Sequence, residues 1–256
     1  MAVIAVDPCI PRRTMIAAMA KRTAERRARR LPTWEDVLRY VVQLLPPVSH
    51  GGKAIMKIIE IRRLIDRGPF SKSEAWKTIE SNVRAAVKAV EWPPGSGSFT
   101  LFDQPGKARG AGSGVKPIKE ACMLYLKSKS WQLELPVPGL AKRFGPFDAG
   151  YKVGPQVFCV EWETGNISSS HRAMNKMAVG MLSGGLIGGL LILPSRTMYR
   201  YLTDRVGNFA ELEPYFPLWQ DLPVRKGLLG VMAIEHDSTS KNVPRIPKGT
   251  DGRALI

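Results

Sequence analysis

Two glutamates, Glu161 and Glu163, lie two residues apart in the apolar segment "VFCVEWETG". Strand alternation places both side chains on one face, about 7 Å apart along the chain. Two ionised carboxylates at this separation repel each other unless a cation lies between them or one stays protonated. Oxygen-rich sites of this kind are suited to Mg²⁺. The pair therefore predicts either a divalent metal site or a solvated sheet edge.

A third acid, Asp148, follows Gly-Pro in "FGPFDAG", where the sequence predicts a turn. The order Pro-x-Asp, a short gap and then Glu-x-Glu on a strand is typical of metal-dependent nucleases. In such enzymes an aspartate and a strand-borne glutamate hold Mg²⁺ at the scissile phosphate, and the residue two positions later activates or positions water. The acids thus favour phosphodiester hydrolysis.

The segment after the acids, "TGNISSSHRAMNKMAVGML", combines polar and basic residues with an apolar stripe. Asn166, Ser168, Ser169 and Arg172 gather at the start of a helix predicted over residues 169–183. A helix N-terminus favours phosphate, and Asn and Arg read base edges in the major groove. Helix capping by Ser168 or Ser169 is the alternative interpretation. The stripe, which indicates a core or subunit contact, consists of Met174, Met177, Ala178, Met181 and Leu182.

The elements that position these residues alternate between strands and helices in the second half of the chain. The pattern predicts strands over residues 156–163, 186–193 and 227–235, and helices over 169–183, 195–203 and about 208–216. This alternation predicts an α/β fold with a central mixed β-sheet flanked by helices.

The first half predicts helices and one long loop. The expected segments are a helix over residues 57–66, a helix over 71–90 capped by Ser71 or Ser73, a mobile loop over 92–114, and a helix within 115–131. The last helix has one apolar face, formed by Ile118, Cys122, Tyr125 and Leu126.

The charge favours a polyanionic partner, because the 256 residues carry a net charge of +16. Residues 1–55 hold 10 basic and 4 acidic residues and read as a basic N-terminal extension. The longest apolar stretch, residues 182–194, is too short to span a bilayer, which takes about 20 residues. Three scattered cysteines indicate a reducing compartment without a disulfide framework.

Several motifs together resemble the BamHI-type restriction endonucleases. The long ones are "EWETGNISSSHRAMNK", "YLTDRVGNFAELEPYF" and "NVPRIPKGTDG", and "VKPIKEAC" and "GPFD" fit the same pattern. The resemblance covers roughly residues 57–252, so residues 56–256 are expected to form the endonuclease domain. It implies a homodimer with the PD-(D/E)XK nuclease fold that cuts double-stranded DNA at GGATCC, working in a prokaryotic cytoplasm and not at a membrane.

The resemblance also implies roles for the acids. Asp148, Glu161, the backbone carbonyl of Trp162 and the more distant Glu134 would be Mg²⁺ ligands, with two ions at each active site. Glu163 occupies the position where most of the superfamily has lysine, and in the BamHI type it acts as general base.

Base reading is implied at three places along the chain. Asn166, Ser168 and Arg172 match the residues that contact bases in the major groove. Asp204 and Arg205 match those that read the outer base pair. Asp251 and Gly252 match the segment that reaches the minor groove. The chain departs from the family at the dimer helix and its facing loop, where charged residues are replaced by Leu182, Ser183 and Pro217. The dimer is therefore expected to persist through apolar contacts.

The sequence thus predicts a Mg²⁺-dependent type II restriction endonuclease that leaves a 5′ phosphate. Two other interpretations remain: a structure-selective repair or recombination nuclease of the same superfamily, and a DNA-binding protein without catalysis. Buried unpaired carboxylates are costly in the absence of a metal, which argues against the last one.

Overall fold

The computed structural model describes residues 56–104, 112–136, 141, 144–203 and 206–248. The chain divides into two compact units, Met1–Gly51 and Gly52–Ile256, and all described residues lie in the second. Four predicted DNA contacts lie outside the described residues, as does the extension over residues 1–55; these contacts are Asp204, Arg205, Asp251 and Gly252.

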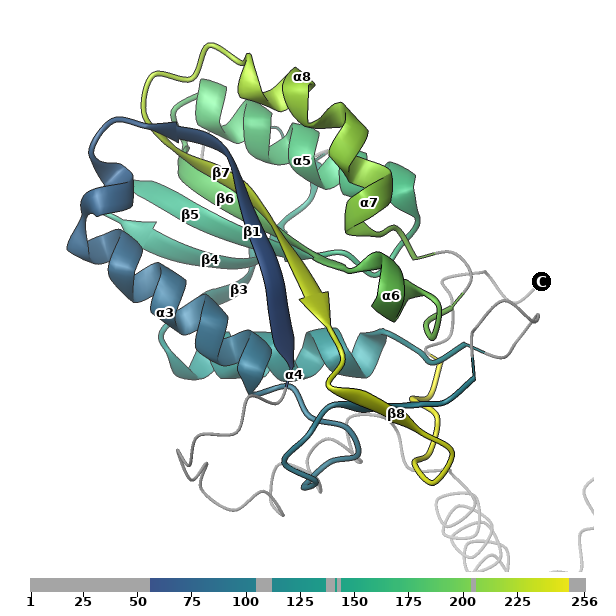
Figure 1. Cartoon of the computed structure of the whole chain (residues 1–256). Coiled ribbons are helices and arrows are strands. Elements are labelled where there is room, and N and C mark those ends of the chain that lie inside the picture. Colours follow the sequence, from purple (N-terminus) through teal and green to yellow (C-terminus); the bar gives the residue numbers. More distant parts are fainter. Residues whose placement is uncertain (1–55, 105–111, 137–140, 142–143, 204–205, 249–256) are drawn as a thin grey trace, which may run out of the picture. The chain divides into compact units, whose positions relative to one another are not determined.

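A six-stranded mixed sheet forms the centre of the second unit (Figure 1). Its strands, in spatial order, are β1 (Lys57–Arg67), β7 (Gly227–Glu235), β6 (Leu186–Pro194), β5 (Gln156–Trp162), β4 (Phe147–Val153) and β3 (Gln132–Leu135). β5, β6 and β7 run parallel, whereas β1, β4 and β3 pair antiparallel with their neighbours. The strands predicted over residues 156–163, 186–193 and 227–235 are confirmed as β5, β6 and β7.

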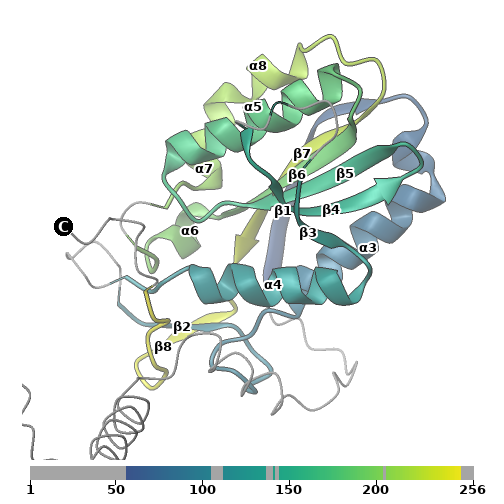
Figure 2. The same ribbon diagram turned by 180° about the vertical axis from the view of Figure 1, so that it is seen from behind.

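Helices cover both faces of the sheet, as Figures 1 and 2 show from opposite sides. One face carries α3 (Glu74–Lys88) and α4 (Lys116–Ser128), and the other carries α5 (Ile167–Leu182), α7 (Phe209–Leu212) and α8 (Phe216–Gln220). Each face has its own apolar cluster. The predicted α/β fold, with a central mixed sheet flanked by helices on both sides, is confirmed.

Strand β5 divides its side chains between the two faces as strand alternation predicts. Phe158, Val160 and Trp162 belong to the cluster under α3 and α4. Val157 and Cys159 belong to the cluster under α5. Glu161 therefore points to the α5 side, where burial of a carboxylate requires a partner.

The methionine stripe of α5 packs into the core. Met174 and Met177 are fully buried, and Ala178 and Met181 nearly so, whereas Leu182 is 49% exposed. α5 begins at Ile167, two residues before the predicted start, and its N-cap is Asn166 rather than Ser168 or Ser169. α3 is capped as predicted, because the Ser73 hydroxyl accepts a hydrogen bond from the Trp76 N–H.

The helix predicted over residues 57–66 is wrong, because this segment forms edge strand β1. Its register on β7 shifts between Ile58 and Glu60 and again between Arg63 and Ile65. Such irregularities break the period-2 pattern, and Leu64 and Ile65 are both buried although adjacent in sequence. The resulting spacing of apolar residues resembles that of a helix, and the sequence pattern therefore predicted one.

The long loop predicted over residues 92–114 is partly wrong. Its described part contains β2 (Thr100–Phe102), which pairs in parallel with β8 (Ser238–Ser240) in a separate two-stranded sheet. Phe99 and Leu101 are fully buried and join the main core. The Gly, Pro and Ser residues on either side are typical of a loop, so the sequence did not predict this short strand.

Two further helices differ from the prediction. α6 covers only Arg196–Tyr199. The helix expected over residues 208–216 is divided into α7, a 3-10 turn (Glu213–Tyr215) and α8, with prolines at the start of the last two pieces. Proline lacks the N–H that an uninterrupted helix needs, so each piece begins anew. No helix in the described ranges is long and apolar enough to cross a bilayer.

Candidate active site

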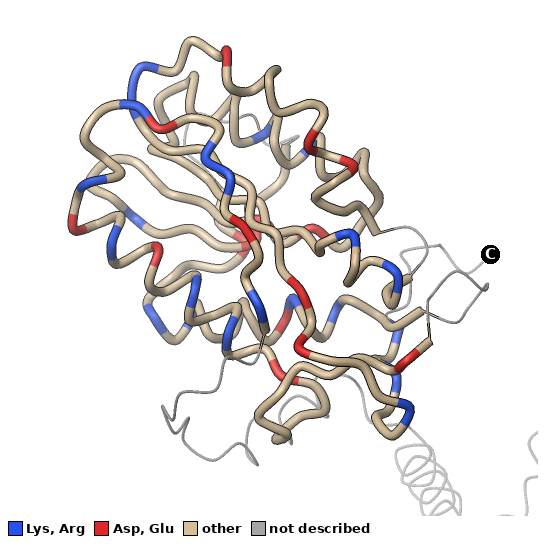
Figure 3. The backbone as a smooth tube through the Cα atoms, in the orientation of Figure 1, with Lys and Arg blue, Asp and Glu red and all other residues tan. Residues whose placement is uncertain are grey.

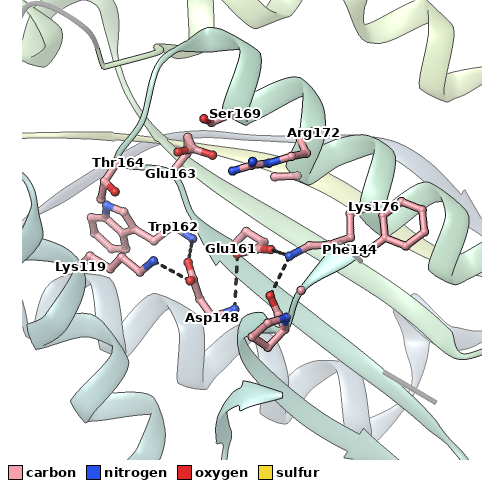
Figure 4. A pocket seen from close by; sticks show the side chains of 13 residues that line it. Lys119, Phe144, Asp148, Glu161, Trp162, Glu163, Thr164, Ser169, Arg172 and Lys176 are labelled. Carbon is pink, nitrogen blue, oxygen red and sulfur yellow. Dashed lines mark hydrogen bonds and ion pairs between the residues drawn. The ribbon is translucent and has the colours of Figure 1, made fainter. Parts of the chain in front are cut away.

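A pocket of about 650 Å³ opens where β4 and β5 meet α4 and α5 (Figure 4). Six of its thirteen lining residues are acidic or basic. The lining residues are Lys119, Phe144, Gly145, Pro146, Asp148, Glu161, Trp162, Glu163, Thr164, Ser169, Arg172, Ala173 and Lys176. The pocket therefore brings together all three acids of the GPFD and EWE motifs.

Asp148 lies in strand β4 rather than in the predicted turn. β4 pairs with β5 so that Ala149 stands opposite Val160, which places Asp148 beside Glu161. The Asp148 side chain is fixed by two donors: Lys119 Nζ donates to Oδ1 at 2.5 Å, and the backbone N–H of Trp162 donates to Oδ2 at 2.8 Å. The carboxylate is thus held rigidly between two strands and a helix.

Glu161 is as buried as Asp148, since both residues are 9% exposed. Its Oε1 forms an ion pair with the ammonium of Lys176, and its Oε2 accepts a long hydrogen bond of 3.4 Å from the Asp148 N–H. Burial raises the pKa of Glu161 to about 7, the Asp148 carboxylate adds to this shift, and Lys176 opposes it. A cation placed between the two acids would relieve their repulsion and favour the ionised form.

Glu163 follows the end of β5 and turns into the same pocket. Its Oε1 accepts a 2.6 Å hydrogen bond from the Gly165 N–H. Burial raises the pKa of Glu163, while the hydrogen bond from Gly165 and the charge of Lys119 lower it. A carboxylate with a raised pKa is a better proton acceptor than an exposed one, which suits a general base.

The start of α5 forms one wall of this pocket. Ser169 and Arg172 line it, and Figure 4 shows them on the Glu163 side. Asn166 caps the helix, because its Oδ1 accepts a 3.2 Å hydrogen bond from the Ser169 N–H. Asn166, Ser168 and Arg172 are exposed, and of these three only Arg172 lines the pocket.

Glu134 is the one described acid of the predicted set that does not line the pocket. Leu133 pairs with Ala149 and Leu135 with Phe147, so Glu134 stands opposite Asp148 on the neighbouring strand. Its side chain is nevertheless exposed, and its backbone has φ of 48°. A non-glycine residue rarely adopts this conformation, and it leaves Glu134 in register with the site but outside it.

The donor set fits a small divalent cation. Asp148 and Glu161 supply carboxylate oxygens, the ligands Mg²⁺ prefers, and Mg²⁺ usually keeps several waters or substrate phosphates as its other ligands. Within the described ranges, no group of three or more His, Cys, Asp or Glu side chains is arranged to hold a metal. The two buried acids are therefore the protein core of the candidate site.

Lys119 and Lys176 also belong to the site, and neither was predicted from the sequence. Lys119 comes from the segment "VKPIKEAC", and 29 positions separate it from Asp148. Lys176 carried a signal, because it interrupts the apolar stripe between Met174 and Met177 and lies one helical turn after Arg172. A lysine inside a buried stripe requires an acidic partner.

Comparison with known proteins agrees with this geometry. The sequence model of the family "Restriction endonuclease BamHI" matches residues 56–253. The chain is 51% identical over 201 residues to the type II restriction enzyme OkrAI of Oceanobacter kriegii, which covers 78% of this chain and 100% of that protein. It is 37% identical over 197 residues to the type II restriction enzyme BamHI of Bacillus amyloliquefaciens, covering 72% of this chain and 85% of that protein.

A solved structure shares the fold at low sequence identity. The restriction endonuclease BglII in complex with a DNA 16-mer aligns with a TM-score of 0.51 at 15% identity, over 75% of this chain and 88% of that one. The family model spans residues 56–253, and this range includes every acid that lines the pocket. The chain therefore belongs to the BamHI family of type II restriction endonucleases.

Proposed function

We propose that this endonuclease uses Mg²⁺ to cut double-stranded DNA at GGATCC, leaving 5′ phosphates on four-base 5′ overhangs. The observation that carries the proposal is the pair of buried carboxylates, Asp148 and Glu161, fixed on adjacent strands in one pocket. The similarity to BamHI and OkrAI supports the choice of reaction. We assign the activity to residues 56–256 and treat residues 1–55 as an appended extension.

Asp148 and Glu161 would hold the metal, with the Trp162 carbonyl as a backbone ligand, and two Mg²⁺ at each site are proposed. Glu134 would join them once its side chain turns towards Asp148, which it faces in register. Bound Mg²⁺ would supply charge stabilisation at the scissile phosphate and at the leaving 3′ oxygen. The sheet would keep the acids within about 0.5 Å of a productive arrangement.

Glu163 would act as the general base on the attacking water. The water oxygen forms a bond to phosphorus, the bond from phosphorus to the 3′ oxygen breaks, and the proton of the water passes to the Glu163 carboxylate. The Gly165 N–H holds that carboxylate in the pocket at 2.6 Å. Arg172, on the same side of the pocket (Figure 4), would contribute positive charge near the DNA.

DNA reading would centre on the start of α5. Asn166, Ser168 and Arg172 would contact bases in the major groove, while Asp204 with Arg205 would read the outer base pair and Asp251 with Gly252 the minor groove. The Asn166 Oδ1 is used for capping, which leaves its amide nitrogen to donate to a base. Lys and Arg are spread along β1, α3 and α4 (Figure 3), and this basic character suits phosphate contact.

Replacing Arg172 by alanine is expected to weaken binding to a GGATCC duplex by roughly 1–3 kcal/mol while sparing most of the affinity for a scrambled duplex. The reason is that a base contact discriminates between sequences, whereas a phosphate contact does not. Titrations of both duplexes at one salt concentration make the comparison. Equal losses on the two duplexes would assign Arg172 to phosphate alone.

A homodimer would form through the outer surface of α5 and the segment that ends in α8. These elements pack side by side, because the Trp219 indole donates to Asn175 at 3.0 Å. Their exposed apolar residues, with exposed fractions of 39%, 49%, 45% and 66%, are Val179, Leu182, Tyr215 and Leu218. Apolar residues exposed on neighbouring helices are typical of an interface between copies.

The double change Leu182→Asp and Leu218→Asp is expected to convert the dimer to monomer at micromolar concentration. In a two-fold symmetric contact each change is present twice, so four charges would be buried without partners. Sedimentation velocity gives the oligomeric state. Leu124→Asp, at an exposed leucine of α4, is the matched control. A double variant that sediments like the unmodified protein would exclude this surface.

The activity itself is tested on a plasmid that carries one GGATCC site. In Mg²⁺ we expect a single linear product, and in EDTA no cleavage. Ca²⁺, which favours more ligands and longer bonds, is expected to support specific binding with little cutting. Cleavage in EDTA at the rate seen in Mg²⁺ would refute the metal dependence. Discrete cutting at another sequence would keep the enzyme class and overturn only GGATCC.

A further inference from the structure

Each of the two buried carboxylates has its own lysine, and the two lysines are held very differently. Lys176 reaches Glu161 from α5, and Lys119 reaches Asp148 from α4, so the pocket contains two ammonium groups beside the acids proposed to bind metal (Figure 4). Neither lysine has a role in the mechanism above. The difference between their surroundings indicates that their roles are distinct.

Lys176 is anchored on several sides. It is 7% exposed, forms the ion pair with Glu161, donates to the Pro146 carbonyl at 2.8 Å, and lies 4.2 Å from the centre of the Phe147 ring. A buried ammonium with these contacts cannot leave without losing all of them. Lys176 pairs with Oε1 of Glu161, whereas Oε2 faces Asp148 and accepts a hydrogen bond from its N–H.

Lys119 has a looser attachment. Its side chain is 27% exposed, compared with 9% for Lys176, and among the described residues its only hydrogen bond is to Asp148 Oδ1. Asp148 accepts a second bond, from the Trp162 N–H, in which Lys119 takes no part. Lys119 can therefore swing away from Asp148 without disturbing the carboxylate.

We propose that Lys119 is a displaceable counter-ion of Asp148, which leaves when a divalent cation binds and then contacts a DNA phosphate. Lys119 and a metal would compete for Oδ1 of Asp148. An ammonium group and a metal cation on the same oxygen would repel each other. Lys176 stays on Glu161 in both states and acts as a positioning residue. This inference rests on the proposed function, since it requires a divalent cation on Asp148.

Calorimetric titration with Ca²⁺, in the absence of DNA, tests the competition. Lys119→Met is expected to raise the Ca²⁺ affinity about tenfold, because the metal no longer displaces an ammonium. Lys176→Met is expected to leave the affinity unchanged or lower it. The matched control is Lys116→Met, one turn earlier on α4, which removes the same charge from an exposed pair with Glu120 at 3.6 Å. We expect it to change the affinity less than twofold.

The outcomes separate this inference from the proposed function. Asp148→Asn should abolish the Ca²⁺ signal, and binding that survives in this variant would overturn the metal site itself. If binding depends on Asp148 but Lys119→Met binds no tighter than Lys116→Met, only the displacement of Lys119 is refuted. Lys119→Gln, which keeps a donor without the charge, replaces the methionine variant if that one does not fold.

The salt dependence of DNA binding gives a second readout. Each phosphate contact contributes a slope of about 0.9 to the plot of log affinity against log salt for duplex DNA. With Ca²⁺ present, Lys119→Met is expected to reduce the slope by about that amount. Without a divalent cation Lys119 remains on Asp148, so the substitution should leave the slope unchanged. An equal reduction under both conditions would show that Lys119 contacts DNA without being displaced.

Discussion

Asp148→Asn is expected to lower the single-turnover cleavage rate of a GGATCC duplex by at least about 10³-fold, with folding and DNA binding retained. The proposed metal would stabilise the transition state by several kcal/mol, and about 4 kcal/mol corresponds to this factor. Asparagine keeps the shape and can still accept from the Trp162 N–H, which donates to Asp148 at 2.8 Å. Only the charge that would hold the cation is lost.

Asp148 is a better position for this substitution than Glu161, because the two substitutions leave different lysines without an acidic partner. Glu161→Gln would strand the buried ammonium of Lys176, and a buried ion pair that loses one partner typically costs about 3–5 kcal/mol of stability. Lys119 is better exposed, so Asp148→Asn avoids that problem. Asp66→Asn, at a solvent-exposed pair with Arg63, controls for charge. An Asp148→Asn rate within tenfold of the unmodified enzyme would remove Asp148 from the metal ligands.

The part of the fold built from regular alternation could be predicted from the sequence. β5, β6 and β7 are mostly apolar segments separated by helices, and the face of each β5 side chain follows from its position. β1 could not be predicted in this way, because two register shifts on β7 bring adjacent Leu64 and Ile65 into the core together. Such shifts depend on pairing with a strand that lies 160 to 178 residues later in the chain.

Within the site, the acids were predicted from the sequence, whereas their lysine partners were not. Glu161 and Glu163 lie on one short segment, so strand periodicity alone brings them together. Asp148 was expected in a turn because Gly145 and Pro146 precede it, yet pairing with β5 draws it into β4. The bond from Lys119 to Asp148 depends on how α4 packs across β4, and local sequence does not encode that arrangement.

Glu163 provides the test of the chemical step. If it is the general base, Glu163→Ala should lower the single-turnover rate by at least about 10²-fold with DNA binding intact. Alanine, however, also removes the carboxylate that accepts the 2.6 Å hydrogen bond from the Gly165 N–H. This hydrogen bond holds the turn before α5. Glu163→Gln separates the two effects, because glutamine can accept that hydrogen bond but is a poor proton acceptor. We expect both variants to be impaired alike, and a nearly normal glutamine variant would limit Glu163 to shaping the turn.

Glu163→Lys extends the test, because most of the superfamily has lysine at this position. The new ammonium would orient water and offset phosphate charge, so some of the cleavage lost in the alanine variant should return. To act as a base its pKa would have to fall, and the nearby Asp148 and Glu161 carboxylates oppose that. It would also enter a pocket that already holds Lys119 and Lys176, so we expect partial rescue at most. The measurement is single-turnover cleavage of a GGATCC duplex in Mg²⁺ by all three variants. Full activity of the alanine variant would remove Glu163 from the catalytic residues and assign the water's proton to another acceptor.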